Sequence, residues 1–259
     1  MTNNNPIGLF DSGIGGSSIW SAIHQLMPNE NTIYLADSKN APYGQKSKDE
    51  IIALSQKNTE MLLDFNCKLI VVACNTATTN AIKELRQKYD VQFIGIEPAI
   101  KPAVNNSTTQ TIGILATAGT LNSTLFIKNL EQYTQTTIIE QVGHNLVNYI
   151  ENGEINSKEV NKLLHDYLEP MIAQNIDYLV LGCSHYPYLI PQIKKILPKN
   201  IKIIDSGEAV ALQTKNILNT HSGLNDGQNI TENIFYSNGN PKILSGILKN
   251  KFDVFFKDF

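Results

Sequence analysis

The sequence predicts an α/β fold of two pseudo-symmetric domains with mostly parallel sheets, and a functional site in the cleft between them. Two observations support this prediction. Short apolar runs alternate with longer amphipathic segments, and several sequence patterns recur in the same order in the second half of the chain. A β-α-β-α order is typical of parallel sheets. The 259 residues, 42% of them hydrophobic, suffice for two modest cores.

The predicted strands are short and mostly apolar throughout, as expected for parallel strands that are buried on both faces. They are expected at residues 7–10, 32–35, 69–73, 92–96, 111–115, 137–142, 178–181 and 201–204, with another near 234–236. The segments between them with helical length and spacing are residues 46–65, 76–89, 121–132 and 157–174.

The recurring patterns indicate an internal duplication. The stretch IGLFDS at residues 7–12 resembles IGILAT at 112–117. The run that ends in ACNT at residues 73–76 resembles the run that ends in GCSH at 182–185. A period of domain length favours two related α/β halves over a solenoid of short repeats.

Two of the three cysteines, Cys74 and Cys183, occupy equivalent places in the two halves. Each follows a predicted strand and precedes a predicted helix, where ligand sites form in parallel sheets. The third cysteine, Cys67, matches the apolar Ile176 and is interpreted as structural. A cysteine at a strand end is usually a small buried hydrophobe. The matched pair, each followed by polar residues, instead favours two thiols that face one cleft.

Two thiols on opposite sides of a cleft suit racemisation, in which a proton leaves one face of a carbon and another returns to the opposite face. The thiolate is the working base, and a helix N-terminus can lower the pKa of a thiol. The free N–H groups that follow Cys74 and Cys183 could also hold a substrate carboxylate. Asp11 and His185 are predicted to orient or tune the thiols.

Two loops are further candidates for ligand contacts. The glycines of DSGIGG at residues 11–16 permit close approach of the backbone to a ligand, although an ordinary βα turn is the alternative. The Pro42-Tyr-Gly44 segment also reads first as a turn, but Tyr43 and the Gly44 N–H could close over an anion. The phenylalanine-rich segment 252–259 is expected to pack against the protein.

Composition argues against several classes of function. Lys and Arg total 21 against 24 Asp and Glu, and no segment concentrates positive charge, so nucleic-acid binding is not expected. The apolar runs are too short to span a membrane. The cysteine and histidine spacing does not indicate a metal site or a disulfide framework. The polar N-terminus lacks a signal-peptide pattern, and we therefore expect a cytoplasmic protein.

Four ordered segments around the two cysteines carry a resemblance to a known family. They are FDSGIGG at residues 10–16, DS at 37–38 with APYG at 41–44, VACNTA at 72–77 and LGCSHYP at 181–187. In these segments the chain resembles the glutamate racemases of the aspartate/glutamate racemase family, and the similarity extends over nearly its whole length. The resemblance implies a first domain of residues 1–97 and 208–259, and a second domain of residues 98–207.

The resemblance also implies an activity: interconversion of L- and D-glutamate without a cofactor or metal, with D-glutamate passing to peptidoglycan synthesis. Cys74 would take the proton from D-glutamate, and Cys183 would take it from L-glutamate. The implied partners are the small-molecule substrate and a second copy of the chain in a homodimer. The substrate-binding positions of the family match Asp11, Ser12, Tyr43, Gly44, Asn75, Thr76, Thr117, Ser184 and His185.

The chain departs from the family pattern in two places. Ser184 stands where the family usually has threonine, which keeps the hydroxyl but removes a methyl group. Family members often carry a Cys-Pro pair and an apolar run before a glutamate, whereas residues 143–151 read GHNLVNYIE. Glu151 matches that glutamate, but the altered run leaves its role open.

Three alternative functions differ from glutamate racemisation in substrate or in chemistry. An aspartate racemase of the same family would use identical chemistry on a shorter substrate. An amino-acid-binding protein without turnover has no need of the two thiols. A nucleotide-dependent enzyme is disfavoured because the sequence lacks a Walker loop and a dinucleotide fingerprint.

Overall fold

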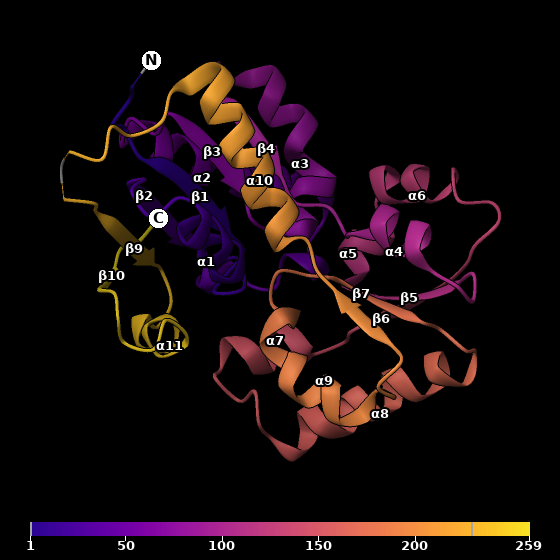
Figure 1. Ribbon diagram of the computed structural model, residues 1–259. Helices are drawn as coiled ribbons and strands as arrows, with labels where there is room; N and C mark the ends of the chain where they lie inside the picture. Colours follow the sequence, from indigo (N-terminus) through magenta and orange to yellow (C-terminus); the bar gives the residue numbers. More distant parts are fainter. Residues whose placement is uncertain (1, 229) are drawn as a thin grey trace.

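The computed structural model describes residues 2–228 and 230–259, and its strands follow the predicted pattern (Figure 1). Each predicted strand is present within one residue at either end. The strands are β1 (Ile7–Asp11), β2 (Thr32–Ala36), β3 (Leu69–Val72), β4 (Gln92–Gly95), β5 (Thr111–Ala116), β6 (Thr137–Val142), β7 (Tyr178–Gly182), β8 (Lys202–Ile204), β9 (Asn233–Ser237) and β10 (Val254–Phe256).

Two parallel sheets organise the two halves. The first has the order β10-β9-β2-β1-β3-β4, and the second has the order β6-β5-β7-β8. The order β2-β1-β3-β4 therefore recurs as β6-β5-β7-β8, so the two halves share one core topology. All of the pairings between these strands are parallel. The predicted α/β fold with two mostly parallel sheets is confirmed.

Helices cover both sheets, and those of the first sheet include one from late in the chain. Helices α1 (Ser17–Leu26) and α10 (Gly207–Ile217) pack together, as do α2 (Lys48–Asp64) and α3 (Asn75–Lys88). In Figure 1, the orange α10 lies beside the indigo and purple first half. The second half carries α4 (Ile100–Asn106), α5 (Ala118–Leu121), α6 (Thr124–Leu130), α7 (Leu146–Glu151), α8 (Lys158–Ala173) and α9 (Ile190–Ile196).

Short helical segments complete the chain. They are the 3-10 turns η1 (Ser38–Asn40), η2 (Tyr43–Gln45) and η3 (Tyr186–Leu189), the π-helical turn η4 (Leu218–Ser222) and the helix α11 (Pro241–Ile247). After α10 the chain returns to the first sheet, where β9 pairs with β2. The domain boundaries at residues 97 and 207 remain a prediction. None of the described helices is both long and apolar enough to cross a membrane.

The helix expected over residues 121–132 is present in part, because α6 covers Thr124–Leu130, whereas Leu121 belongs to the preceding short helix α5. Two hydroxyl caps explain the break. Thr117 caps α5 by accepting a hydrogen bond from the Thr120 N–H, and Ser123 caps α6 by accepting one from the Phe126 N–H. A second cap only a few residues after the first starts a new helix and ends the previous one.

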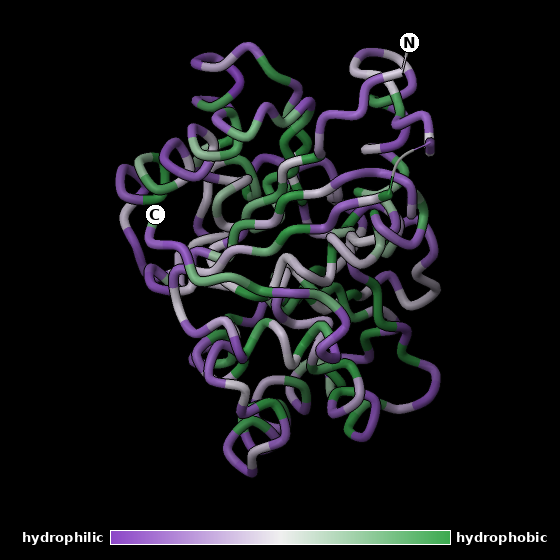
Figure 2. The backbone as a smooth tube through the Cα atoms, turned by 90° about the vertical axis from the view of Figure 1, so that its left-hand side faces the viewer, coloured by the Kyte–Doolittle hydropathy of each residue, from purple (hydrophilic) through white to green (hydrophobic). Residues whose placement is uncertain are grey.

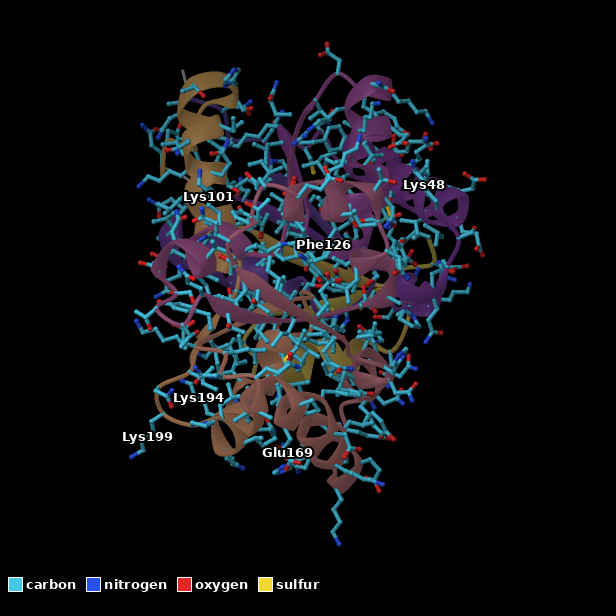
Figure 3. All side chains as sticks on the ribbon, turned by 90° about the vertical axis from the view of Figure 1, so that its right-hand side faces the viewer. Lys48, Lys101, Phe126, Glu169, Lys194 and Lys199 are labelled. Atoms are coloured by element: carbon cyan, nitrogen blue, oxygen red, sulfur yellow. The ribbon has the colours of Figure 1, made fainter. Side chains whose placement is uncertain are left out.

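The hydrophobic core runs through both halves. One cluster of buried side chains includes Leu9 and Trp20 from the first half and Leu181 and Tyr186 from the second. Figure 2 shows hydrophobic stretches along the central chain segments and hydrophilic ones in many outer loops. In Figure 3, the labelled Lys199 projects from the periphery of the second half. Because the core is shared, the facing ends of the two sheets are held close together.

Two expectations about single segments have different outcomes. Cys67 is buried in the core against Gly8, as a structural cysteine should be, and burial raises the pKa of its thiol to about 12. The terminal aromatic segment packs only in part. Phe252 lies edge-on to Trp20, but Phe255 and Phe256 are 52% and 63% exposed. Strand β10 is the edge strand of its sheet, so its outer side faces solvent.

Candidate active site

A pocket between the two halves is lined by both equivalent cysteines, Cys74 and Cys183. The pocket is nearly closed in this structure, with a cavity volume of about 10 Å³, roughly the room that one water molecule needs, so a small molecule enters only if its walls move apart. Of the predicted site residues, Asp11 alone is not part of its wall. The remaining wall residues are Ser12, Pro42, Tyr43, Gly44, Asn75, Thr76, Thr117, Val147, Ser184 and His185.

Cys74 lies at the junction between β3 and α3. Its sulfur accepts a hydrogen bond from the Ala77 N–H at 3.4 Å, and its S–H donates one to the Ser12 hydroxyl oxygen at 3.6 Å. Burial, and then the nearby Asp11 carboxylate, raises the pKa of Cys74 more than the contacts with Ala77 and Ser12 lower it. The expectation that the helix start lowers the pKa is therefore wrong for Cys74 in this structure. The Cys74 side chain holds its proton and can act as an acid.

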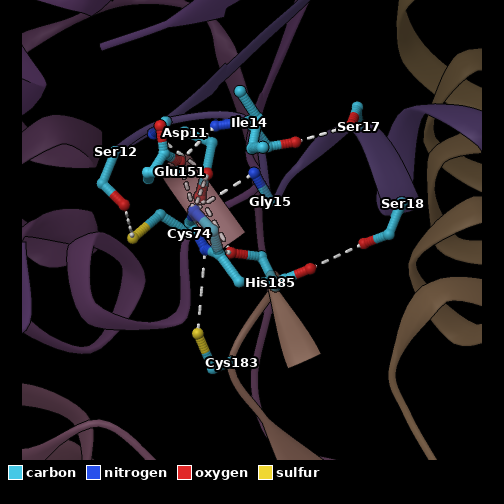
Figure 4. A network of polar contacts seen from close by, with 12 residues as sticks. Asp11, Ser12, Ile14, Gly15, Ser17, Ser18, Cys74, Glu151, Cys183 and His185 are labelled. Atoms are coloured by element: carbon cyan, nitrogen blue, oxygen red, sulfur yellow. Dashed lines mark hydrogen bonds and ion pairs between the residues drawn. The ribbon is translucent and has the colours of Figure 1, made fainter. Parts of the chain in front are cut away.

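Cys183 follows β7 on the other side of the pocket and lies next to an imidazole. His185 Nδ1 is 3.8 Å from Cys183 Sγ, and His185 Nε2 is 2.6 Å from Glu151 Oε1 (Figure 4). Burial opposes a charge on His185, but Cys183, Glu151 and Asp11 together raise the pKa of the imidazole well above its ordinary value. The ring is placed to exchange a proton with the Cys183 sulfur.

The glycine loop after β1 receives side chains from the second half. A Cβ atom at Gly13 would overlap the Glu151 carboxylate, and one at Gly15 would overlap the His185 ring. The Ile14 N–H also donates to Glu151 Oε1 at 2.7 Å. The close approach that glycine permits is therefore used by protein side chains, and it joins the two halves behind the pocket.

Asp11 lies behind the pocket wall and also joins the two halves. Its Oδ1 accepts a hydrogen bond from the Ser184 hydroxyl at 3.0 Å, and its Oδ2 accepts one from the Gly13 N–H at 3.1 Å. Burial raises the pKa of Asp11, and the neighbouring His185 opposes this shift. Ser184, which replaces the threonine usual in the family, thus still donates the hydroxyl hydrogen bond to Asp11.

The opposite part of the wall combines threonine hydroxyls with a free amide. Thr76 Oγ1 lies 2.9 Å from Thr117 Oγ1, so the first half contacts the second at the rim. The Asn75 side chain is 2% exposed, and neither its oxygen nor its nitrogen has a hydrogen-bond partner among the described residues. Because buried amides are normally satisfied, Asn75 is suited to bind a polar ligand in the pocket.

Tyr43 and Gly44 also form part of the pocket wall. The Tyr43 hydroxyl points away from the pocket and donates to Asp37 Oδ2 at 2.5 Å. The ring and the backbone of Tyr43, rather than its hydroxyl, therefore remain for ligand contacts.

Within the described part of the chain, no cluster of three or more His, Cys, Asp and Glu side chains could hold a metal ion.

The sequence of the chain matches a known family over most of its length. Residues 17–214 match the profile of the family described as Asp/Glu/Hydantoin racemase. The chain belongs to this racemase family. As a member of it, the protein is an amino-acid racemase.

Named racemases of this family resemble the chain in sequence and in structure. A glutamate racemase of Ectopseudomonas mendocina is 42% identical over 218 residues, which are 83% of each chain. The structure of an Escherichia coli glutamate racemase with L-glutamate and the activator UDP-MurNAc-Ala has a TM-score of 0.88 at 29% identity, covering 98% of both chains. A Francisella tularensis glutamate racemase with D-glutamate has a TM-score of 0.84 at 27% identity, covering 98% and 97%.

Sequence reasoning left the roles of some residues in this racemase open. Glu151 was matched to a family glutamate, and in the structure it contacts His185. Asp37 was noted only as part of a motif, although it holds Tyr43. Val147 was not proposed as a wall residue. Residues 143–151, which contain Val147 and Glu151, depart from the family pattern. The resemblance in this segment was therefore too weak to predict a role for either residue.

Proposed function

We propose that this racemase interconverts L- and D-glutamate by proton transfer between Cα and two cysteine thiols, without a cofactor. The observation that carries the proposal is that Cys74 and Cys183 line one pocket from opposite halves. The named relatives are glutamate racemases, and two of them bind glutamate in their structures. These likenesses support glutamate over aspartate as the substrate.

The proton balance of the reaction needs no oxidant or reductant. From L- to D-glutamate, the Cys183 thiolate takes the α-proton, and the electron pair of the C–H bond stays on Cα. The Cys74 thiol then gives a proton to the opposite face of Cα, which leaves Cys74 as the thiolate. The reverse direction exchanges the two roles. The proton that Cys74 holds in this structure fits the direction that starts from L-glutamate.

The remaining pocket residues bind and orient the substrate in this proposal. The Asn75 amide and the Thr76 hydroxyl at the start of α3 hold a carboxylate, where free N–H groups of the helix also point. Ser12 lies in the pocket wall, and its hydroxyl oxygen accepts a hydrogen bond from the substrate ammonium group. Asp11, behind the wall, holds Ser184 in place. His185 exchanges a proton with Cys183 between turnovers.

The mechanism is tested with Cys74→Ser and Cys183→Ser, each measured for exchange of the α-proton of both enantiomers in D₂O. We expect each variant to lose racemisation, because one face of Cα then lacks its proton donor. A variant that keeps exchange with a single enantiomer would identify which thiol serves which face. Full racemisation by either variant would refute the two-thiol mechanism.

The substrate and the assembly are tested separately. Turnover of glutamate should far exceed that of aspartate, and the reverse result would identify aspartate as the substrate.

We also propose that the D-glutamate product serves peptidoglycan synthesis and that the protein is a homodimer. Rescue of a depleted strain by D-glutamate tests the first proposal, and analytical ultracentrifugation tests the second.

A further inference from the structure

Asn238 follows β9 and reaches a loop that is about two hundred residues away in the sequence. Its side chain is 4% exposed. The Nδ2 group donates to Asp37 Oδ1 at 2.5 Å and to the Phe259 carbonyl at 3.0 Å. Its Oδ1 accepts a hydrogen bond from the Lys39 N–H at 2.9 Å. Acceptors face the nitrogen and a donor faces the oxygen, so only one orientation of the amide satisfies all three contacts.

Asp37 connects Asn238 to the wall of the pocket. The carboxylate is 1% exposed, and its second oxygen accepts the hydroxyl hydrogen of Tyr43 at 2.5 Å. Asn40 Nδ2 donates to the same oxygen as Asn238, at 2.8 Å. Burial raises the pKa of Asp37, and the donors from Tyr43, Asn238 and Asn40 oppose this shift. The carboxylate is thus held by neutral donors, and Asn238 is the donor that comes from the distant β9 segment.

The direction of the Tyr43 hydroxyl is also determined. Asn58 Nδ2 donates to the Tyr43 oxygen at 3.1 Å, so the hydroxyl hydrogen is directed at Asp37. Tyr43 leads directly into Gly44, and a Cβ atom at Gly44 would lie 2.9 Å from the Thr117 Cβ of the other half. A small displacement of Tyr43 therefore moves the wall of a pocket that has little spare volume.

We propose that Asn238 is a positioning residue for the racemase reaction: it orients Asp37, which holds the Tyr43–Gly44 wall against the substrate. The inference rests on the proposed function for the identity of the substrate. It does not require Asn238 to touch the substrate. Asparagine suits the position because aspartate would place a second carboxylate against Asp37, and serine offers a single, shorter donor.

The test compares Asn238→Asp and Asn238→Ser with the wild-type protein, using KM and kcat for both glutamate enantiomers. We expect KM to rise about tenfold for Asn238→Asp, with a smaller rise for Asn238→Ser and little change in kcat. Asn240→Ala is the matched control. Asn240 lies in the same segment and caps α11 through the Lys242 N–H, so its loss weakens the segment and leaves the contact with Asp37 intact.

A double variant separates positioning from general damage. Tyr43→Phe removes the hydroxyl that Asp37 holds, so adding Asn238→Ser to it should raise KM no further. Unchanged KM in both folded Asn238 variants, an equal rise in Asn240→Ala, or additive effects in the double variant would each overturn the inference. Absence of glutamate racemisation by the wild-type protein would instead refute the proposed function, and the inference with it.

Discussion

The charge of His185 depends on contacts from both halves of the molecule. It is 1% exposed, yet its pKa is raised, because Cys183, Glu151 and Asp11 outweigh the effect of burial. The sequence indicated His185 through its place two residues after Cys183. It did not indicate the contact with Glu151, since that contact depends on how α7 packs on the glycine loop.

Glu151→Gln tests the role of this carboxylate. Removing the negative charge should lower the pKa of His185, so the imidazolium loses its proton at lower pH than in the wild-type protein. We expect kcat to fall at least about tenfold, since proton exchange with Cys183 is impaired. The His185 titration is followed by NMR of labelled histidine. Glu154→Gln, at an exposed position nearby, is the control, and an unchanged titration in Glu151→Gln would contradict the account.

Cys74 shows what sequence reasoning could and could not provide for a single residue. Its place at a strand end and helix start was predictable from the apolar run before it and the helical spacing over residues 76–89 after it. Cys183 also lies at a strand end, but a 3-10 turn rather than an α-helix follows it. The direction of the Cys74 pKa shift was not predictable, because it depends on complete burial and on the Asp11 carboxylate nearby. Both are consequences of tertiary packing, whereas the helix start is a local feature.

At the scale of elements, α5 approaches α3 and the Tyr43–Gly44 wall through a glycine. A Cβ atom at Gly119 would lie 2.9 Å from Thr76 Cγ2 and 3.0 Å from the Gly44 Cα. Since the second contact is with backbone, the elements must move apart to accept a side chain. The contact of the Asn80 amide with the Gly119 carbonyl, at 3.0 Å, would be lost as well.

Gly119→Ala should therefore raise KM and destabilise the protein by about 1–3 kcal/mol. Gly246→Ala is the control, because a Cβ at this helical glycine meets nothing within 4 Å and should be neutral or slightly stabilising. Steady-state kinetics and urea unfolding measure the two effects. Equal behaviour of the two variants would show that the close approach is unimportant.

Asp177 holds the turn before β5 to the start of β7. Its carboxylate accepts hydrogen bonds from Ser107 Oγ at 2.7 Å, from the Thr108 N–H at 2.6 Å and from the Thr109 N–H at 3.2 Å. Burial favours a higher pKa, but these bonds prevail and lower it from 3.8 to about 2. A lowered pKa in the folded state stabilises the protein above the unfolded-state pKa.

This stabilisation should be lost as the pH falls from about 4 to about 2, through the folded-state pKa. Asp177→Asn should lower the free energy of unfolding at pH 7 by about 1–3 kcal/mol and weaken the acid dependence. Urea denaturation as a function of pH measures both effects. Asp166→Asn, at an exposed position on α8, should change neither, and a full acid dependence in Asp177→Asn would contradict the assignment.

The elements themselves were predictable to different degrees. Strands β1 to β9 were predicted within one residue. Fully buried strands such as β1 and β7 are continuous apolar runs, whereas β6 and β8 are only partly buried and carry shorter apolar stretches. The split between α5 and α6 was missed because Thr117 and Ser123 act as caps only in the folded geometry. The exposure of Phe255 and Phe256 was missed because the sequence does not reveal that β10 ends a sheet.

At the scale of the whole molecule, two copies of one topology face each other through the ends of their central strands. The duplication was readable from recurring motifs, and the repeated strand order agrees with it. The glycine loop, Asp11 and the Thr76–Thr117 contact then join the halves around the pocket. Neither half alone contains both thiols, so the proposed reaction requires the complete two-domain molecule.

The most direct test of the two-thiol mechanism is a crystal structure with glutamate bound, which gives the distance from each cysteine sulfur to the substrate Cα. We predict Cys74 Sγ and Cys183 Sγ on opposite faces of Cα, each within about 3.5–4 Å. Both sulfurs on one face of Cα, or glutamate bound outside the pocket that they share, would contradict the two-thiol mechanism.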